Sequence, residues 1–286
     1  MSDTATYQSA ETPSGKGAAD ENFPVGSFLL PAPLRPHVAV FYAYARAIDD
    51  VADNPDLAPD EKVARLEGFA AAIRGERDDP AYEKAVRMRA SLVETNITTK
   101  HCLDLISAFK QDAVKGRYAN WGELLDYCDR SAAPVGRYLL DLHGEDPADY
   151  RYSDALCNAL QVINHLQDCQ TDYRQIDRVY LPLDWLTEVD GKVDDLGAQR
   201  LNPALRMVLD RCLEGTEALM VDARLLAGHL TSRRLAAESA TIVKIADKLI
   251  GELSRRDPLA ERVELTKPQV LFCGLAGIAA ALFRRG

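Results

Sequence analysis

Apolar residues recur every three to four positions along almost the whole chain, while the alternating pattern typical of half-buried strands is nearly absent. This spacing puts apolar side chains on one face of successive helices. Helices are predicted near residues 32–54, 60–75, 80–95, 99–115, 119–143, 152–174, 199–229, 232–255 and 268–284. Residues 175–198, which contain a proline and two glycines, are expected to form a loop with a short helix. The pattern therefore predicts an all-α fold, a large bundle whose sites lie between facing helices.

The length and composition of the chain favour a single domain. The chain has 286 residues, of which 47% are hydrophobic, enough for one large core or two small ones. No linker rich in proline, glycine or serine follows residue 31, so a single domain is expected over residues 23–286. Residues 1–22 are rich in small and polar residues without helical periodicity, which predicts a disordered leader. They contain no apolar segment of the kind that a secretory signal needs.

Charge and cysteine usage narrow the class of protein. The net charge of −10 argues against nucleic acid as a partner and against a polybasic membrane patch. The six cysteines form no C-x-x-C pair, which favours buried thiols in a reducing cytoplasm over disulfides or a zinc site. The longest apolar run, residues 270–283, is too short to span a bilayer. We therefore expect a cytoplasmic protein in which this run forms a core helix or a peripheral contact with a membrane surface.

Two D-x-x-x-D pairs lie far apart in the chain. At about 100° per residue, the first falls on a polar helical stripe roughly 60° wide, formed by Tyr42, Arg46, Asp49 and Asp53. The second shares a face roughly 80° wide that is formed by Gln161, Asn164, Asp168 and Asp172. A single D-x-x-x-D motif usually lies on a solvated helix face. These two motifs instead continue apolar helices, where burying an unpaired carboxylate is costly in free energy. Two pairs on facing helices would form a carboxylate cage for Mg²⁺, which can then hold a diphosphate through bridging metals.

Two further motifs surround the second pair. Tyr127 precedes small residues at 131–133 and 136, which would let a helix or a ligand chain approach the backbone closely. Plain helix packing is the alternative interpretation of these small residues. Past the second pair, Arg178 and Tyr180 could close over an anionic group. A surface loop with a charge pair between neighbouring residues is the alternative there.

Taken in order, these motifs resemble the squalene/phytoene synthase family of head-to-head prenyl synthases, over roughly residues 23–283. The two aspartate motifs of that family match Asp49 with Asp53 and Asp168 with Asp172. Its tyrosine motif matches Tyr127, and its Q-x-x-N pattern matches Gln161 and Asn164. The resemblance implies a single-domain isoprenoid (terpenoid) synthase helical bundle with a central cavity.

Three segments most resemble the branch of the family that makes hydroxysqualene in bacterial hopanoid biosynthesis, namely residues 21–25, 131–136 and 164–168. Squalene and phytoene synthases usually carry Val-Ala-Gly where this chain has Ser-Ala-Ala at 131–133, and Arg where it has Gln167. The loss of that arginine removes one expected diphosphate contact. In the implied reaction, presqualene diphosphate reacts with water to give hydroxysqualene and diphosphate.

The resemblance also implies a role for each motif residue. Metal ions, Mg²⁺ or alternatively Mn²⁺, would be held by the four motif aspartates and neutralise the departing diphosphate. Arg46 and Arg178 would add fixed positive charge, with Tyr42 and Tyr180 as further substrate-binding residues. Tyr127, Tyr42 and Phe41 would face the carbocation with π density, worth about 0.5–2 kcal/mol. The metal shell or the attacking water would be oriented by Gln161 or Asn164, and His165 on the same arc could do so too. A satisfied helix histidine is the alternative interpretation of His165.

Other products and another class of function remain open at this point. A relative that makes presqualene diphosphate, squalene or phytoene would share the same motifs, and squalene would require a reductant such as NADPH. A non-catalytic helical protein that binds prenyl lipids, or that binds a sister synthase for complex assembly, would need no metal cage. The four intact aspartates therefore favour an enzyme that binds a prenyl diphosphate.

Overall fold

The computed structural model describes residues 10–12 and 30–283, and within them every regular element is helical apart from one isolated β-bridge between Arg117 and Val179. The all-α prediction is therefore confirmed. Apart from residues 10–12, the predicted disordered leader at residues 1–22 lies outside the described residues. The chain divides into two compact units, Met1–Val114 and Lys115–Gly286, and the single domain over residues 23–286 stays a prediction.

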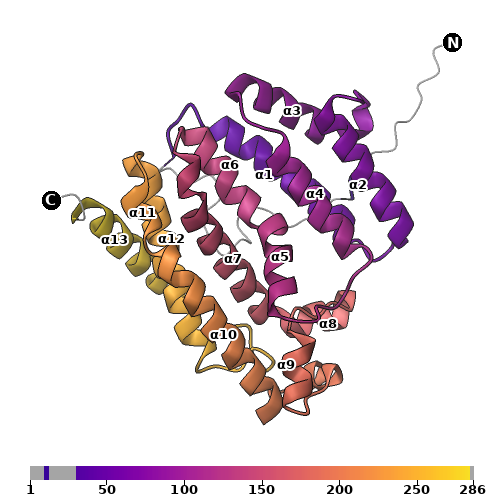
Figure 1. Cartoon of the computed structure of the whole chain (residues 1–286), viewed down its shortest axis with the longest axis vertical. Helices are drawn as coiled ribbons and strands as arrows, with labels where there is room; N and C mark the ends of the chain where they lie inside the picture. Colours follow the sequence, from indigo (N-terminus) through magenta and orange to yellow (C-terminus); the bar gives the residue numbers. More distant parts are fainter. Residues whose placement is uncertain (1–9, 13–29, 284–286) are drawn as a thin grey trace. The chain divides into compact units, whose positions relative to one another are not determined.

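The first unit is a small bundle that carries the first aspartate pair on its first helix. Its described elements are α1 (Arg35–Asp53), α2 (Pro59–Arg74), the 3-10 helix η1 (Pro80–Tyr82), α3 (Glu83–Thr95) and α4 (Lys100–Asp112). α1 packs on α3 and α4, and α2 packs on the same two helices (Figure 1). Gly75 ends α2 with a left-handed φ of 79°, a conformation that glycine adopts without strain. The core formed in this way fixes α1 and the polar stripe that it carries.

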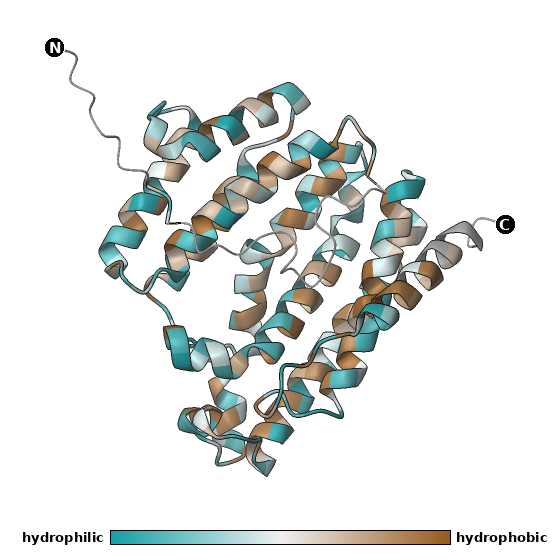
Figure 2. Ribbon diagram, turned by 180° about the vertical axis from the view of Figure 1, so that it is seen from behind, coloured by the Kyte–Doolittle hydropathy of each residue, from teal (hydrophilic) through white to brown (hydrophobic). Residues whose placement is uncertain are grey.

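The second unit is built around one long helix that carries the second aspartate pair. Its described elements are α5 (Trp121–Ser131), α6 (Ala133–His143), η2 (Pro147–Asp149), α7 (Tyr150–Gln167), α8 (Cys169–Ile176), α9 (Leu183–Glu188), η3 (Val193–Gly197), α10 (Pro203–Ala223), α11 (Leu226–His229), α12 (Arg233–Leu253) and α13 (Lys267–Phe283). α7 packs against α5, α6, α10 and α12. Figure 2 shows hydrophobic and hydrophilic residues alternating along most helices, as expected for helices that each bury one face.

Some long predicted helices are interrupted. The predicted helix 119–143 divides at Ala132, where φ is −122°. Pro134 follows in the first turn of α6, a position that proline favours because it has no N–H to donate. The predicted helix 152–174 divides at Asp168, whose φ is −105° and ψ is 8°. Helical hydrogen bonds nevertheless run through Asp168, because its N–H bonds to Asn164 and its carbonyl accepts from Asp172. The two aspartates of the second motif therefore stay one helical turn apart.

The last helix, α13, is apolar on more than the face that it buries. It packs along α12, where Cys273 and Gly277 are buried and a Cβ on Gly277 would lie 2.5 Å from the Thr241 backbone. Leu271, Phe272 and Leu275 are 66%, 73% and 63% exposed. Among the described residues, every helix is too short or too polar to cross a membrane.

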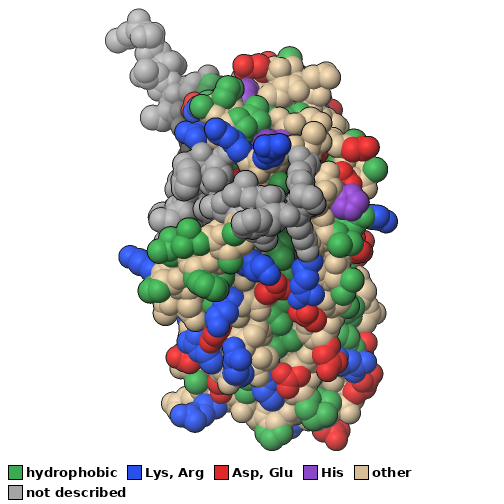
Figure 3. All heavy atoms as spheres, turned by 90° about the vertical axis from the view of Figure 1, so that its left-hand side faces the viewer, with side chains coloured by type: hydrophobic (Ala, Val, Ile, Leu, Met, Phe, Trp, Pro, Cys, Tyr) green, Lys and Arg blue, Asp and Glu red, His purple; other side chains and the backbone are tan. Residues whose placement is uncertain are grey.

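Charged side chains also cover much of the surface. On the face shown in Figure 3, hydrophobic side chains reach the surface among Lys, Arg, Asp and Glu, with both signs of charge interspersed. The six cysteines are free thiols, and all except the half-buried Cys157 are buried. Buried free thiols are what the cysteine spacing predicts.

Candidate active site

In the first unit, Arg46 joins two carboxylates on its own helix. Its Nη1 lies 3.1 Å from Asp49 Oδ2 and its Nη2 lies 3.0 Å from Asp50 Oδ1, one turn further along α1. Asp50 is only 8% exposed, whereas Asp49 is 31% exposed. The helical stripe predicted Arg46, Asp49 and Asp53 but missed Asp50, which lies to one side of it. Part of the Arg46 charge is therefore committed to holding this buried carboxylate.

Negative charge accumulates around Asp49. Desolvation raises the pKa of its carboxyl well above the usual range, and the neighbouring Asp53, Asp50 and Asp112 carboxylates raise it further, against the opposite effect of Arg46. The side chain still keeps access to solvent, so the desolvation arises from the protein packed around the carboxyl rather than from complete enclosure. Asp112, which ends α4 and is buried, was not predicted from the sequence. Hard divalent cations prefer oxygen ligands of this kind, so the donor set fits a metal.

In the second unit, a distant arginine contacts the second aspartate pair. Arg262 Nε lies 3.1 Å from Asp168 Oδ1, and the same guanidinium lies 3.0 Å from Glu264. The Asp168 side chain is 34% exposed and Asp172 is half-buried. No spacing rule connects Arg262 to residue 168, so this contact could not be predicted from the sequence. Arg262 supplies positive charge beside Asp168. Position 167, where the family resemblance led us to expect an arginine, is a glutamine in this chain.

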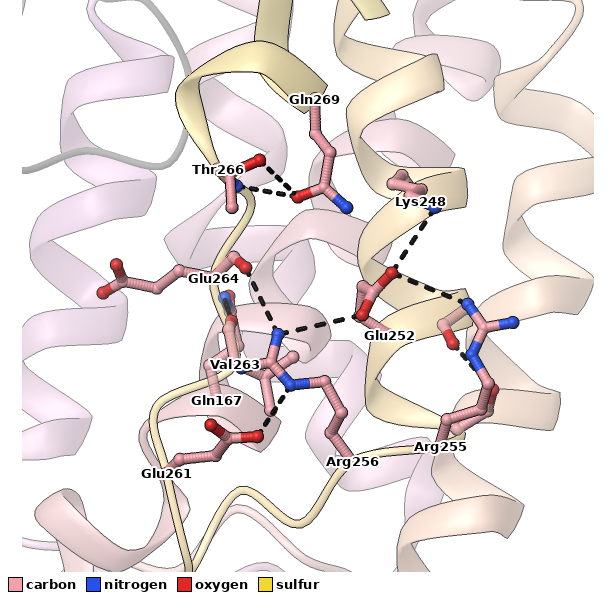
Figure 4. A network of polar contacts seen from close by, with 12 residues as sticks. Gln167, Lys248, Glu252, Arg255, Arg256, Glu261, Val263, Glu264, Thr266 and Gln269 are labelled. Carbon is pink, nitrogen blue, oxygen red and sulfur yellow. Dashed lines mark hydrogen bonds and ion pairs between the residues drawn. The ribbon is translucent and has the colours of Figure 1, made fainter.

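Gln167 itself has a structural role. It is 3% exposed and donates a hydrogen bond from Nε2 to the Val263 carbonyl at 2.5 Å. Figure 4 shows the polar network around this segment, in which Arg256 bonds Glu261 at 2.9 Å and approaches Glu252 at 3.8 Å. These contacts fix the backbone that carries Arg262.

Four aromatic side chains of the second unit form one buried cluster. The Tyr180 ring stacks on His165 with centroids 3.5 Å apart and on Tyr118 at 5.5 Å. Tyr127 lies 5.3 Å from Tyr118, 5.8 Å from Tyr180 and 6.0 Å from His165. All four side chains are less than a tenth exposed. The cluster brings the predicted Tyr127 and Tyr180 together, on α5 and on the loop after α8.

Backbone pairing between two segments positions this loop. Asp177 ends α8 in the left-handed region, with φ of 51°, and the chain then runs beside residues 116–119. The N–H of Val179 bonds to the Gly116 carbonyl at 2.9 Å. A Cβ on Gly116 would lie 2.7 Å from the Asp177 carbonyl, so the close approach needs glycine there. Arg178 and Tyr180 are 6% and 7% exposed, so the surface-loop alternative for them is not what the structure shows.

The remaining predicted residues lie on one helix of each unit. Tyr42, Gln161 and Asn164 are half-buried, on α1 and α7. Gly136 packs against α7, where an added Cβ would lie 2.2 Å from Ser153 Oγ, so helix packing does explain this small residue. Within the described residues, no group of three or more His, Cys, Asp or Glu side chains forms a metal site by itself. Each aspartate pair would therefore need additional ligands, such as diphosphate oxygens or water.

Comparison with known proteins places these motifs in a family. The squalene/phytoene synthase family profile matches residues 17–269. The hydroxysqualene synthase of Rhodopseudomonas palustris is 40% identical over 276 residues, covering 96% of this chain and 94% of the relative. The enzyme of the same name from Zymomonas mobilis is 42% identical over 270 residues, covering 94% and 90%.

A solved structure agrees with this assignment. The crystal structure of squalene synthase HpnC from Alicyclobacillus acidocaldarius superposes with a TM-score of 0.71 at 31% identity, covering 81% of this chain and 87% of that one. The family resemblance seen in the motifs is thereby confirmed, together with the isoprenoid synthase type of fold. The central cavity expected with it stays a prediction. The profile match, the relatives and the all-helical structure agree, and the chain belongs to the squalene/phytoene synthase family.

Proposed function

We propose that this protein converts presqualene diphosphate and water into hydroxysqualene and diphosphate. The observation that carries the proposal is the similarity to hydroxysqualene synthases at 40% and 42% identity over nearly the full chain. Gln167 and the Ser-Ala-Ala run at 131–133, which depart from the squalene and phytoene synthase pattern, support the same branch. The protein would then act in squalene and hopanoid biosynthesis.

The reaction begins with loss of diphosphate, whose negative charge must be neutralised as it leaves. Members of this family use prenyl diphosphates and generally depend on a divalent metal. We propose Mg²⁺, with Asp49, Asp53, Asp168 and Asp172 as protein ligands, because carboxylate oxygens and diphosphate are its preferred partners. Bound there, the metal would neutralise the charge that develops on the leaving group.

Side chains of the second unit would bind and orient the diphosphate. Arg178 is buried and Arg262 already contacts a motif aspartate, so both guanidinium groups are fixed in place before substrate arrives. Guanidinium groups match the geometry of phosphate oxygens and stay charged at every working pH. Arg46 would act mainly by holding Asp49 and Asp50 in position.

The carbocation that forms must then be stabilised until water captures it. Tyr127 and Tyr180 belong to a buried cluster whose rings offer π density to a cation without offering a strong nucleophile. Each such contact contributes about 0.5–2 kcal/mol. Gln161 and Asn164, half-buried on the same face of α7, are the proposed groups that orient the metal shell.

Product analysis tests the proposal. The protein is incubated with presqualene diphosphate and Mg²⁺ in ¹⁸O-labelled water, with and without NADPH. We expect an alcohol that carries one labelled oxygen, in a yield that does not depend on NADPH. Squalene that rises with NADPH would instead assign the chain to squalene synthesis, which is the function named for the Alicyclobacillus structure. Consumption of farnesyl diphosphate alone would assign it to the preceding step.

We also propose that α13 makes peripheral contact with a membrane. Substrate and product carry long hydrocarbon chains, and α13 exposes Leu271, Phe272 and Leu275 side by side on a helix too short to span. Lys244 and Lys248 line the groove between α12 and Phe272, where they would face lipid headgroups. Apolar side chains flanked by lysines are typical of helices that lie in the membrane interface.

Vesicle flotation tests this contact. Phe272→Ser with Leu275→Ser should abolish flotation with vesicles of phosphatidylcholine and phosphatidylglycerol. Val93→Ser is the matched control, because Val93 is an apolar residue that is 77% exposed on a different helix, α3. Equal flotation of the double variant and the control would reject the proposed surface, and contact with a sister enzyme would then be the alternative role of α13.

A further inference from the structure

One ring nitrogen in the aromatic cluster lacks a partner that its burial requires. His165 is 7% exposed, and its Nε2 has no hydrogen-bond partner among the described residues. A buried polar atom left unpaired costs about 1–3 kcal/mol, and such atoms usually bind an ordered water or a ligand. The interpretation of His165 as a satisfied helix histidine therefore does not hold for this atom.

The surroundings of His165 keep its ring in place and uncharged. The ring lies parallel to Tyr180, with an interplanar angle of 11°, and its centroid is 6.0 Å from that of Tyr127. Burial and the nearby Arg178 guanidinium lower its pKa to about 3. A neutral imidazole has one nitrogen that donates and one that accepts, so the tautomer with its proton on Nδ1 leaves Nε2 able to accept a proton.

A second unpaired polar atom lies on the facing helix. Ser131 is 8% exposed, and its Oγ also has no partner among the described residues. Ser131 follows Tyr127 by four residues at the end of α5, so the two share one face of that helix. α5 packs on α7, which carries His165. A buried water needs two to four polar partners, and each of these two side chains offers one such partner.

We propose that His165 holds the water molecule that captures the carbocation and accepts its proton, with Ser131 as the second polar group of the water site. The inference rests on the proposed function and adds to it the residue that directs water rather than elimination.

The step balances without any further reagent. The ester C–O bond breaks and its electron pair leaves with diphosphate, which produces the carbocation. After rearrangement, a lone pair of the water oxygen forms the new C–O bond, and one proton passes from that oxygen to His165 Nε2. An alkyl oxonium ion is far more acidic than an imidazolium, so even a ring with a lowered pKa can accept this proton. The imidazolium then releases the proton to solvent.

Product distribution in variants of His165 tests the role. His165→Phe keeps a ring to stack on Tyr180 but removes both nitrogens. We expect the ratio of hydroxysqualene to elimination hydrocarbons to fall about tenfold, which corresponds to the loss of one buried hydrogen bond. Diphosphate release should stay within about threefold of the wild type, since ionisation precedes water capture. His165→Gln, which restores a polar atom, should recover part of the alcohol.

His229→Phe is the matched control. His229 also stacks on a tyrosine, Tyr152 at 4.2 Å, but it is 44% exposed and its Nδ1 lies 3.2 Å from Asp149. Its variant should leave the product ratio unchanged. An unchanged ratio in His165→Phe as well would overturn the inference.

A structural measurement covers the case in which His165→Phe does not fold. A crystal structure of the wild type at high resolution should show an ordered water within about 3.2 Å of Nε2. A partner from the protein at that nitrogen would overturn the inference, whatever the variants do. Failure of the wild type to consume presqualene diphosphate is a different result, because it rejects the proposed function first and the role of His165 with it.

Discussion

Gln167 and Val263 are joined by a hydrogen bond of 2.5 Å from the Nε2 of Gln167 to the Val263 carbonyl, although 96 residues separate them in the chain. Both residues are buried. Arg262, next to Val263, reaches Asp168, which is next to Gln167, at 3.1 Å. One buried side chain therefore anchors the backbone segment that delivers an arginine to the second aspartate pair. The glutamine that replaces the usual family arginine holds another arginine in place.

The first prediction concerns this anchor. Gln167→Leu should lower the free energy of unfolding by about 1–3 kcal/mol, because the Val263 carbonyl would be buried without a donor. Amide hydrogen exchange at residues 259–265 should rise, and turnover should fall because Arg262 loses its fixed position. Urea unfolding and exchange mass spectrometry measure the two effects.

Gln175→Leu is the control for this prediction, because Gln175 is an exposed residue of α8. It should leave stability and exchange at residues 259–265 unchanged. Unchanged exchange in Gln167→Leu would mean that the segment is held by its other contacts, such as those of Arg256 with Glu252 and Glu261.

The second prediction concerns the aspartate pairs. Asp53→Ala and Asp168→Ala should each lower kcat by about 100-fold or more, since even outer-shell partners of a metal are worth about 10–100-fold. Helicity measured by circular dichroism should not change, because both side chains are partly exposed. Asp56→Ala, in the exposed loop after α1, should retain full activity. Near-normal turnover in either motif variant would exclude a metal-binding role for that pair.

The helices themselves were largely predictable because burial of one face imposes a period that the sequence displays. The interruptions at Ala132 and Asp168 were not predicted, since the periodicity of apolar residues continues through both. At Asp168 the backbone departs from helical angles while its hydrogen bonds persist, and no residue type in the sequence marks such a change.

Helical spacing could predict the candidate site residues that share a helix. Asp49 and Asp53 follow from spacing, as do Asp168 and Asp172. Contacts that join distant segments left no such pattern, as the pairs Arg262–Asp168 and Gln167–Val263 show. Asp50 and Asp112 were missed because one lies beside the predicted stripe and the other on a separate helix, where only packing brings it near Asp49.

The third prediction separates structure from catalysis at Arg46. Arg46→Met should lower the free energy of unfolding by about 3 kcal/mol, because the buried Asp50 would lose a partner at 3.0 Å. Arg46→Met combined with Asp50→Leu should recover much of this stability, since an apolar pair can replace a buried ion pair. Urea unfolding measures both. A double variant that is no more stable than Arg46→Met would show that the loss does not come from Asp50.

The buried carboxyl of Glu238 should make the free energy of unfolding depend on pH. It lies on α12, is 7% exposed, and its Oε2 has no partner among the described residues. Desolvation raises its pKa from 4.5 to about 7. Between these values the folded protein binds a proton that the unfolded chain has released, so stability falls as pH rises through this window. His165 acts in the opposite sense, because its pKa is lowered to about 3 and stability falls as pH drops below 6.5.

The last prediction is that Glu238→Gln removes this dependence. The difference in free energy of unfolding between variant and wild type should shift in favour of the variant by about 3 kcal/mol from pH 4.5 to pH 8.5. His165 is present in both proteins, so its contribution cancels in this difference. Glu214→Gln, made at an exposed position of α10, should show no shift over the same range. A wild type and Glu238→Gln whose urea unfolding curves change in parallel with pH would mean that the carboxyl is ionised and paired when folded.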